Sequence, residues 1–287
     1  MTQLPIDLSN RTDLAALVEL IEAIRKKWPD RELLLVGATA RDILLSYANG
    51  IRIERATLDH DFAVAVADWK EFDDLRNALL SGGTFTEEKG VLHRLIFQPK
   101  GTKLDLIPFG GVERSDRTIA WPPDQNEVLQ VIGYREAMRD AILVHLPAGQ
   151  QINVVSLPAL TMLKLFAWKD RRMSSLGKDA ADLWTIIRHY LETGNETKIY
   201  FETEALLAQE NYDHSRTGAW MLGKDIRELL SRTEDDSALK ATIELLEIEV
   251  DENGDLHLAR DMRRIEAQQA YDLLTALHAG LIGKPYP

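Results

Sequence analysis

One short segment, Leu58-Asp59-His60-Asp61, constrains the fold more than any other, because the apolar run Phe62-Ala63-Val64 follows it at once. Residues i and i+2 of a β-strand face the same side of a sheet, so a strand over residues 58–66 presents Asp59 and Asp61 together. Two neighbouring carboxylates repel each other, and the repulsion grows when water is removed from around them. The segment therefore predicts a strand that enters a hydrophobic core and carries a charged patch at its start.

A divalent cation would remove this repulsion, since Mg²⁺ prefers carboxylate oxygens and leaves coordination positions for phosphates. The simpler interpretation is a pair of solvated acids where a strand begins, a place where aspartate is common. A third acid, Asp105, lies in the apolar run Leu104–Ile107, where an unpaired charge is costly to bury. Together, Asp59, Asp61 and Asp105 predict a metal site, with two Mg²⁺ ions expected.

The sequence Val36-Gly37-Ala38-Thr39 lies where a buried strand over residues 33–36 is expected to turn into a helix. The backbone N–H groups and the positive dipole end of that helix form a site that suits a phosphate. A glycine turn of this kind is common at strand–helix junctions, so it indicates a phosphate site only in combination with the three acids.

The remaining pattern predicts a mixed α/β (α+β) fold, in which a sheet flanked by helices is followed by a mostly helical region. Expected strands cover residues 33–36, 58–66, 94–97 and 103–108, with the last two antiparallel around Pro99-Lys100-Gly101. In the first half, expected helices cover residues 14–28, 40–47 and 69–80, the last capped by Asp68. In the second half they cover residues 157–168, 178–192, 203–209, 215–232, 236–247 and 260–280.

Two further expectations concern chain organisation. Ile248 to Leu258 alternates apolar and polar residues around Asn253-Gly254, which predicts a β-hairpin with a type I′ turn. The change of character around Pro147–Gly149 places a domain boundary near residues 148 to 156, giving domains of residues 1–150 and 151–287.

Composition excludes several classes of protein. The 287 residues include no cysteine, which excludes disulfides and thiolate metal sites. The longest unbroken apolar run is far shorter than the roughly 20 residues that cross a bilayer, and the start does not resemble a secretory signal. A formal net charge of −12 disfavours binding to nucleic acid through an extended basic surface. We expect a cytoplasmic protein with no membrane partner.

The order of these motifs resembles the nucleotidyltransferase superfamily with the polymerase-beta-like fold: a glycine turn, an Asp-x-Asp strand, and one acid on a later strand. Gly37 to Leu45 resembles the glycine and Arg-Asp segment of transfer-RNA nucleotidyltransferases, although Ala38 stands where a second glycine or a serine is usual. Three segments, Ile107–Glu113, Leu157–Trp168 and Lys178–Leu183, resemble the AbiEii/AbiGii toxin-type nucleotidyltransferases.

The resemblance implies roles for further residues. Gly37, Ala38, Thr39 and Arg41 would contact the nucleotide, and Thr39 would supply the hydroxyl that Ala38 lacks. In the second half, Lys164 and Asp179 would complete the catalytic site, with Lys178 and Asp182 beside them. Arg171 and Arg172 are expected in a solvated turn, and Lys164→Ala is expected to perturb stability little.

The implied function is a metal-dependent transfer of a nucleoside monophosphate from a nucleoside triphosphate (NTP) to an acceptor hydroxyl. Toxin-type relatives suggest an RNA 3′ end, most plausibly transfer RNA, and a cognate antitoxin as a partner. A small molecule or a protein hydroxyl would use the same chemistry, and the net negative charge mildly favours a cationic small acceptor or a narrowly docked RNA. A non-catalytic descendant that binds a nucleotide or a partner is the alternative from another class, and Ala38 is the residue that favours it.

Overall fold

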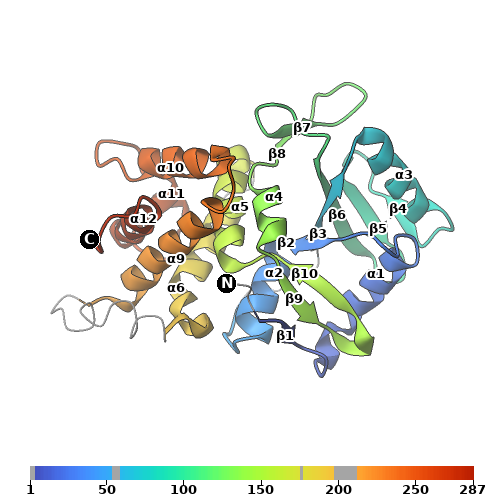
Figure 1. Ribbon diagram of the computed structural model, residues 1–287, viewed down its shortest axis with the longest axis horizontal. Helices are drawn as coiled ribbons and strands as arrows, with labels where there is room; N and C mark the ends of the chain where they lie inside the picture. Colours follow the sequence, from blue (N-terminus) through green and yellow to red (C-terminus); the bar gives the residue numbers. More distant parts are fainter. Residues whose placement is uncertain (1–3, 54–58, 175–176, 197–211) are drawn as a thin grey trace. The chain divides into compact units, whose positions relative to one another are not determined.

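The strand with the two acids, β3 (Asp59–Val66), lies inside an eight-stranded mixed sheet (Figure 1). The structure is a computed structural model that describes residues 4–53, 59–174, 177–196 and 212–287. Its contacts divide the chain into two compact units. The sheet unit comprises Met1–Ile43 and Ile53–Ser156, and the helical unit comprises Leu44–Arg52 and Leu157–Pro287.

The strand order in the sheet is β1-β9-β10-β2-β3-β6-β5-β4. Besides β3, these strands are β1 (Ile6–Asp7), β2 (Leu34–Val36), β4 (Phe85–Glu87), β5 (Arg94–Phe97), β6 (Thr102–Gly110), β9 (Ile142–His145) and β10 (Gln151–Val154). β3 is antiparallel to β2 and parallel to β6, which is antiparallel to β5. A separate antiparallel pair joins β7 (Thr118–Ala120) to β8 (Val128–Gln130).

The helices of the sheet unit are α1 (Ala15–Arg25), α2 (Gly37–Asp42), α3 (Trp69–Leu80) and α4 (Tyr134–Arg139). As expected, the Asp68 side chain caps α3, because its carboxylate accepts the backbone N–H of Glu71. Trp28 Nε1, just after α1, donates to the carbonyl of Leu75 in α3 at 2.9 Å. The apolar residues of the central strands are buried, including Leu34, Leu35, Phe62 and Leu104, which are 0% exposed.

The helical unit contains six α-helices among its described residues. They are α5 (Leu157–Arg171), α6 (Lys178–His189), α9 (His214–Leu230), α10 (Ser237–Glu249), α11 (His257–Asp261) and α12 (Ala267–Leu281). Two π-helical turns, Ile43–Tyr47 and Leu191–Asn195, continue α2 and follow α6. No helix among the described residues is both long enough and apolar enough to span a membrane.

The mixed sheet and the helical second half confirm the expected fold class, but the hairpin at 248–258 is wrong. α10 runs through Ile248 to Glu249, and after a turn at Asn253-Gly254 the chain enters α11. The Glu249 carboxylate accepts the N–H of Leu258 at 2.7 Å, so the turn joins two helices. Ile248 is 65% exposed, and a hairpin without further strands to cover it is only marginally stable.

Two other expectations change in detail. The helix expected over 260–280 is two helices, α11 and α12, and α2 begins at Gly37 rather than at residue 40. The helix expected over 203–209 lies outside the described residues. β10 belongs to the central sheet, and the sheet unit ends at Ser156.

We predict that Gly223→Ala destabilises the protein, because α9 and α12 approach closely at two glycines. A Cβ at Gly223 would lie 2.1 Å from the carbonyl oxygen of Leu277, and one at Gly280 would lie 2.0 Å from that of Trp220. Both contacts are with backbone, so the helices must separate, at a cost of about 1–3 kcal/mol or more. Gln268→Ala, on the exposed surface of α12, is the control and should change the free energy of unfolding by less than about 0.5 kcal/mol. Equal denaturant midpoints for the two variants would contradict the prediction.

Candidate active site

A row of residues crosses four adjacent strands of the sheet unit. Val36 of β2 pairs with Asp61 of β3, Asp61 with Asp105 of β6, and Asp105 with Arg94 of β5. Paired residues on neighbouring strands point to the same face, and Asp59 shares that face through its i+2 spacing. The register therefore brings Asp59, Asp61 and Asp105 to one face of the sheet.

Gly37 and Asp61 are in close contact at the end of this row. A Cβ at Gly37 would lie 2.0 Å from Oδ2 of Asp61, and the backbone there has a φ of +69°. Both observations require glycine, because any other residue would displace the carboxylate and strain the backbone. The carboxylate thus lies at the first turn of α2, where the helix dipole favours negative charge.

Asp105 is paired with Arg94, a residue that sequence reasoning missed. Arg94 Nε donates to Oδ1 of Asp105 at 2.6 Å and Nη2 donates to Oδ2 at 2.8 Å. These hydrogen bonds raise the pKa of Arg94 above its ordinary value. Burial acts in the opposite direction, but its effect is smaller. His93 Nε2 lies 4.0 Å from Oδ2 of Asp105. The length of the turn between β5 and β6 sets this pairing, and knowledge of that length would have identified Arg94.

The side chain of Thr39 links α2 to β3 through hydrogen bonds to Asp59 and His60. The Thr39 hydroxyl lies 3.1 Å from the carbonyl oxygen of Asp59, to which it donates, and 2.9 Å from Nδ1 of His60. Burial lowers the pKa of His60 to about 4, with Asp59 acting weakly in the opposite sense, so His60 is neutral at pH 7. The hydroxyl expected to contact a phosphate is therefore engaged within the protein.

The other two residues expected at the nucleotide, Ala38 and Arg41, are also buried. Ala38 is 7% exposed and Arg41 is 2% exposed. Arg41 Nε donates to Oδ1 of the adjacent Asp42 at 2.8 Å. In this arrangement the backbone of Gly37 and Ala38 is the part of the turn best suited to a phosphate.

The acids fit a divalent cation only in part. Their carboxylate oxygens are the donors that Mg²⁺ prefers, and the shared face and the Gly37 contact hold Asp61 in a fixed place. However, the described residues include no group of three acidic or histidine side chains arranged to hold a metal ion, and Arg94 binds both oxygens of Asp105. Asp59 and Asp61 are thus the residues best placed to hold Mg²⁺.

A second charged cluster joins α5 to α6 inside the helical unit. Lys164 Nζ lies 2.9 Å from Oδ1 of Asp179 and 2.7 Å from Oδ2 of Asp182. Arg171 Nε donates to Oδ2 of Asp179 at 2.7 Å and Nη2 donates to Oδ1 at 2.9 Å. Lys164, Asp179 and Asp182 are buried, so Lys164 is not an exposed lysine on a helix edge.

The charges of this cluster stabilise one another. Burial disfavours the Lys164 ammonium, but Asp182 and Asp179 together outweigh that effect and raise its pKa. Burial likewise disfavours the Asp179 carboxylate, and the hydrogen bonds of Arg171 and the charge of Lys164 outweigh it and lower the pKa of Asp179. Arg171, expected in a solvated turn, is instead a partner of Asp179, although 46% of its side chain is exposed. Lys178, the first residue of α6, is partly exposed.

We therefore replace the expectation that Lys164→Ala perturbs stability little. Removing the ammonium leaves Asp179 and Asp182 buried with less positive charge nearby, which should lower the free energy of unfolding by about 3–5 kcal/mol. Lys169→Ala, at an exposed position of the same helix, should change it by less than about 0.5 kcal/mol. Denaturant unfolding at pH 7 measures both variants.

The sign of the pH dependence follows from Asp179. Its pKa in the folded protein lies below the ordinary value of 3.8, so its stabilising effect is complete well above that pH and is lost as the pH falls below it. The difference in stability between the wild type and Asp179→Asn should begin to narrow below about pH 4. A difference that widened between about pH 5 and pH 3 would contradict the assignment.

Several solved structures resemble this chain. The solution structure of the antibiotic-resistance factor ANT(2'')-Ia has 14% sequence identity and a TM-score of 0.35, covering 67% of this chain and 95% of that one. The crystal structure of ANT(2'')-Ia in complex with adenylyl-2''-tobramycin has 17% identity and a TM-score of 0.36, covering 64% and 99%. An antigenic nucleotidyltransferase-like protein from Paracoccidioides brasiliensis has 17% identity and a TM-score of 0.39, covering 69% and 91%.

Among curated protein sequences, none matches this chain. A protein-family model does match, over residues 20–279, and describes the nucleotidyl transferase AbiEii toxin of type IV toxin–antitoxin systems. The match includes all three sheet acids and the Lys164 cluster, and it confirms the resemblance seen in the sequence. The chain is therefore a transferase that belongs to the AbiEii family of nucleotidyltransferase toxins.

Proposed function

We propose that this enzyme transfers a nucleoside monophosphate from an NTP to the 3′ hydroxyl of an RNA, with transfer RNA as the first candidate, in a reaction that depends on Mg²⁺. The observation that carries the proposal is the contact of the Gly37 turn with Asp61 and the pairing of Asp61 with Asp105, two adjacent carboxylates on one sheet face. Nucleotidyl transfer needs these components, because its catalysis consists mainly of positioning and charge neutralisation.

Each residue of the row has a part in the reaction. The backbone of Gly37 and Ala38 would bind the β- and γ-phosphates, and Asp59 and Asp61 would hold Mg²⁺. Asp105, fixed by Arg94, would accept the proton of the acceptor hydroxyl or assist in holding a second ion. Bound Mg²⁺ would neutralise the triphosphate and favour ionisation of that hydroxyl.

The step is an in-line displacement. The acceptor oxygen forms a bond to the α-phosphorus, the bond from that phosphorus to the bridging oxygen breaks, and pyrophosphate leaves with the electron pair. The proton of the acceptor passes to Asp105 or to water.

The assignment of Lys164, Asp179 and Lys178 to the site rests on the resemblance and stays a prediction. Arg171 joins this group, because it binds Asp179 and remains nearly half exposed. A cognate antitoxin is part of the proposal because the family consists of toxins from toxin–antitoxin systems.

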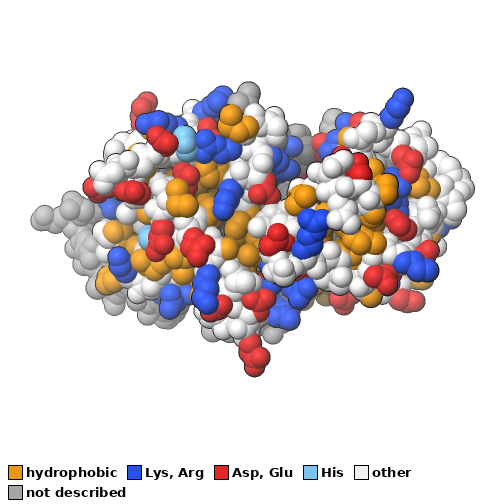
Figure 2. Space-filling model, turned by 90° about the horizontal axis from the view of Figure 1, so that it is seen from above, with side chains coloured by type: hydrophobic (Ala, Val, Ile, Leu, Met, Phe, Trp, Pro, Cys, Tyr) orange, Lys and Arg blue, Asp and Glu red, His pale blue; other side chains and the backbone are white. Residues whose placement is uncertain are grey.

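The surface charge supports narrow docking of an RNA end. On the face drawn in Figure 2, basic and acidic side chains are interspersed, consistent with the net charge of −12. Broad binding to an RNA backbone requires a continuous basic surface. Recognition of a few terminal nucleotides requires only a local site.

The test is incubation of the protein with each α-labelled NTP, Mg²⁺ and total RNA, followed by a search for labelled RNA. We expect labelling with at least one NTP, its loss on chelation of Mg²⁺, and its loss in Asp61→Asn, which removes a ligand charge. Asp74→Asn, at an exposed position in α3, is the matched control and should leave labelling intact. Label on protein or on a small molecule instead would favour the other acceptors, and binding of an NTP without any transfer would favour the non-catalytic alternative.

A second prediction tests the contact between Gly37 and Asp61. Gly37→Ala should reduce kcat by about 100-fold or more, because the new Cβ displaces the Asp61 carboxylate and small misplacements in a reacting site carry large penalties. Gly50→Ala is the matched control, since Gly50 has the same φ of +69° and a Cβ there would meet nothing within 4 Å.

Both substitutions share the cost of a left-handed backbone, about 1–2 kcal/mol, and only the substitution at Gly37 adds a collision with Asp61. Steady-state transfer rates of the two variants measure the difference in activity that the collision with Asp61 causes. Equal loss of activity in the two variants would attribute the effect to backbone strain and remove Gly37 from the proposed site.

A further inference from the structure

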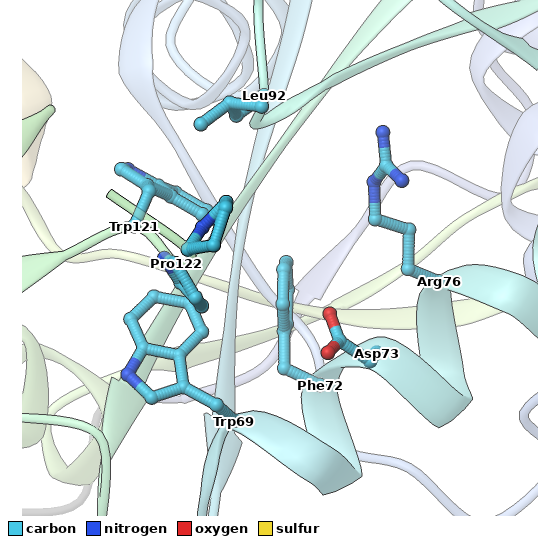
Figure 3. A pocket seen from close by; sticks show the side chains of 8 residues that line it. Trp69, Phe72, Asp73, Arg76, Leu92, Trp121 and Pro122 are labelled. Carbon is cyan, nitrogen blue, oxygen red and sulfur yellow. The ribbon is translucent and has the colours of Figure 1, made fainter. Parts of the chain in front are cut away.

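An aromatic pocket of about 320 Å³ lies in the sheet unit (Figure 3). It is lined from α3, from the residue before His93, and from the segment that follows β7: Trp69, Phe72, Asp73, Arg76, Leu92, Trp121, Pro122 and Pro123. The ring centroids of Trp69 and Trp121 are 5.2 Å apart, and those of Phe72 and Trp121 are 5.4 Å apart. The proposed reaction so far assigns this pocket no part.

His93 connects the pocket to the row of acids. Its ring centroid lies 6.1 Å from that of Trp121, and its Nε2 lies 4.0 Å from Oδ2 of Asp105. Along the row, Gly37 follows β2 at one end, and Arg94 stands in β5 at the other. His93 therefore links the pocket to the Arg94 end of the row, which is the end opposite the Gly37 turn.

The in-line geometry of the displacement determines which substrate lies at the Arg94 end of the row. In an in-line displacement, the attacking oxygen and the leaving oxygen lie on opposite sides of the phosphorus. With pyrophosphate at the Gly37 turn, the acceptor approaches over β6 and β5. The pocket lies beside this approach.

We propose that the pocket binds one unpaired nucleobase near the 3′ end of the acceptor RNA, an inference that rests on the proposed function. Aromatic side chains stack on bases, which are planar. The volume is at the lower end of the range for small-molecule sites, which suits a group of the size of one base. Asp73 and Arg76 add a carboxylate acceptor and a guanidinium donor for the edge of a base, with Arg76 held by Glu87 at 2.6 Å.

This chemistry also discriminates between an RNA and a cationic small molecule, two of the acceptors that the sequence left open. An aminoglycoside carries several positive charges and is not aromatic, so it calls for a site lined mainly with carboxylates. Here the lining has one acid, one arginine and six apolar residues. The pocket thus favours a base-bearing acceptor over a polycationic one.

The experiment measures binding of single-stranded RNA octamers by fluorescence anisotropy, without NTP. One octamer is intact, and three others lack the base at one of the last three positions but keep every phosphate, so their electrostatic attraction is equal. For the wild type we expect one abasic octamer to bind about tenfold more weakly than the intact one, since stacking contributes about 1–3 kcal/mol per base.

Two variants connect this difference to the pocket. In Trp69→Ala and in Leu92→Ala the ratio between the intact and abasic octamers should fall toward one, and Trp69→Phe should retain most of it. Leu92 is 38% exposed, so its variant keeps the test valid if Trp69→Ala does not fold. Trp184→Ala, in α6, is the matched tryptophan control and should keep the wild-type ratio.

Other results would overturn the inference. If no abasic position weakens binding to the wild type, the pocket does not hold a base of the acceptor. If Trp69→Ala instead weakens stabilisation by NTPs in thermal unfolding and leaves the octamer ratio unchanged, the pocket holds the incoming base. Failure of the proposed function would give a different result, which is the absence of transfer from every NTP. Binding of the octamers is measured without NTP and is therefore a separate readout.

Discussion

The contact of Asp61 with Gly37 is the constraint on which the candidate active site depends. The carboxylate occupies the space where a side chain at position 37 would lie, so β3 can pass the start of α2 only if that residue is glycine. From Asp61 the register extends to Asp105 and on to Arg94, because each strand is hydrogen-bonded to the next. A shift of one residue in any of these pairings would turn an acid or Arg94 to the opposite face of the sheet.

The buried and crowded carboxylates of the two units lie in different electrostatic surroundings. In the helical unit, Asp179 and Asp182 are matched by Lys164 and Arg171 within hydrogen-bonding distance. In the sheet unit, Arg94 binds Asp105 in the same bidentate manner, and His93 lies close by. Asp59 and Asp61 stand together at the start of β3. In the proposed reaction, Mg²⁺ would supply the positive charge that such a pair of carboxylates favours. The charges of the Lys164 cluster, in contrast, are matched by side chains of the helical unit.

Much of the site could be predicted from local patterns. The strand with Asp59 and Asp61, the glycine turn, and Asp105 in an apolar strand all follow from spacing and hydrophobicity, and β5 is where the sequence places it, over Arg94–Phe97. These local patterns leave the register of β5 on β6 undetermined. A three-residue turn at Pro99–Gly101 would have placed Leu95 opposite Asp105, but the four-residue turn places Arg94 there. One residue of turn length, which composition leaves undetermined, decides whether Asp105 faces a guanidinium or a leucine.

By itself the sequence determined the fold class, the family and the three sheet acids, because strand periodicity and short motifs are local properties of the chain. Only the tertiary structure decided which distant groups meet. The 248–258 segment became two helices because the Glu249 carboxylate binds the N–H of Leu258. Lys164 became buried through α6, and Trp69 and Trp121 came together across 52 positions of sequence to line one pocket. Such contacts depend on how elements pack, and packing is fixed by the shape of whole surfaces rather than by any short pattern of residues.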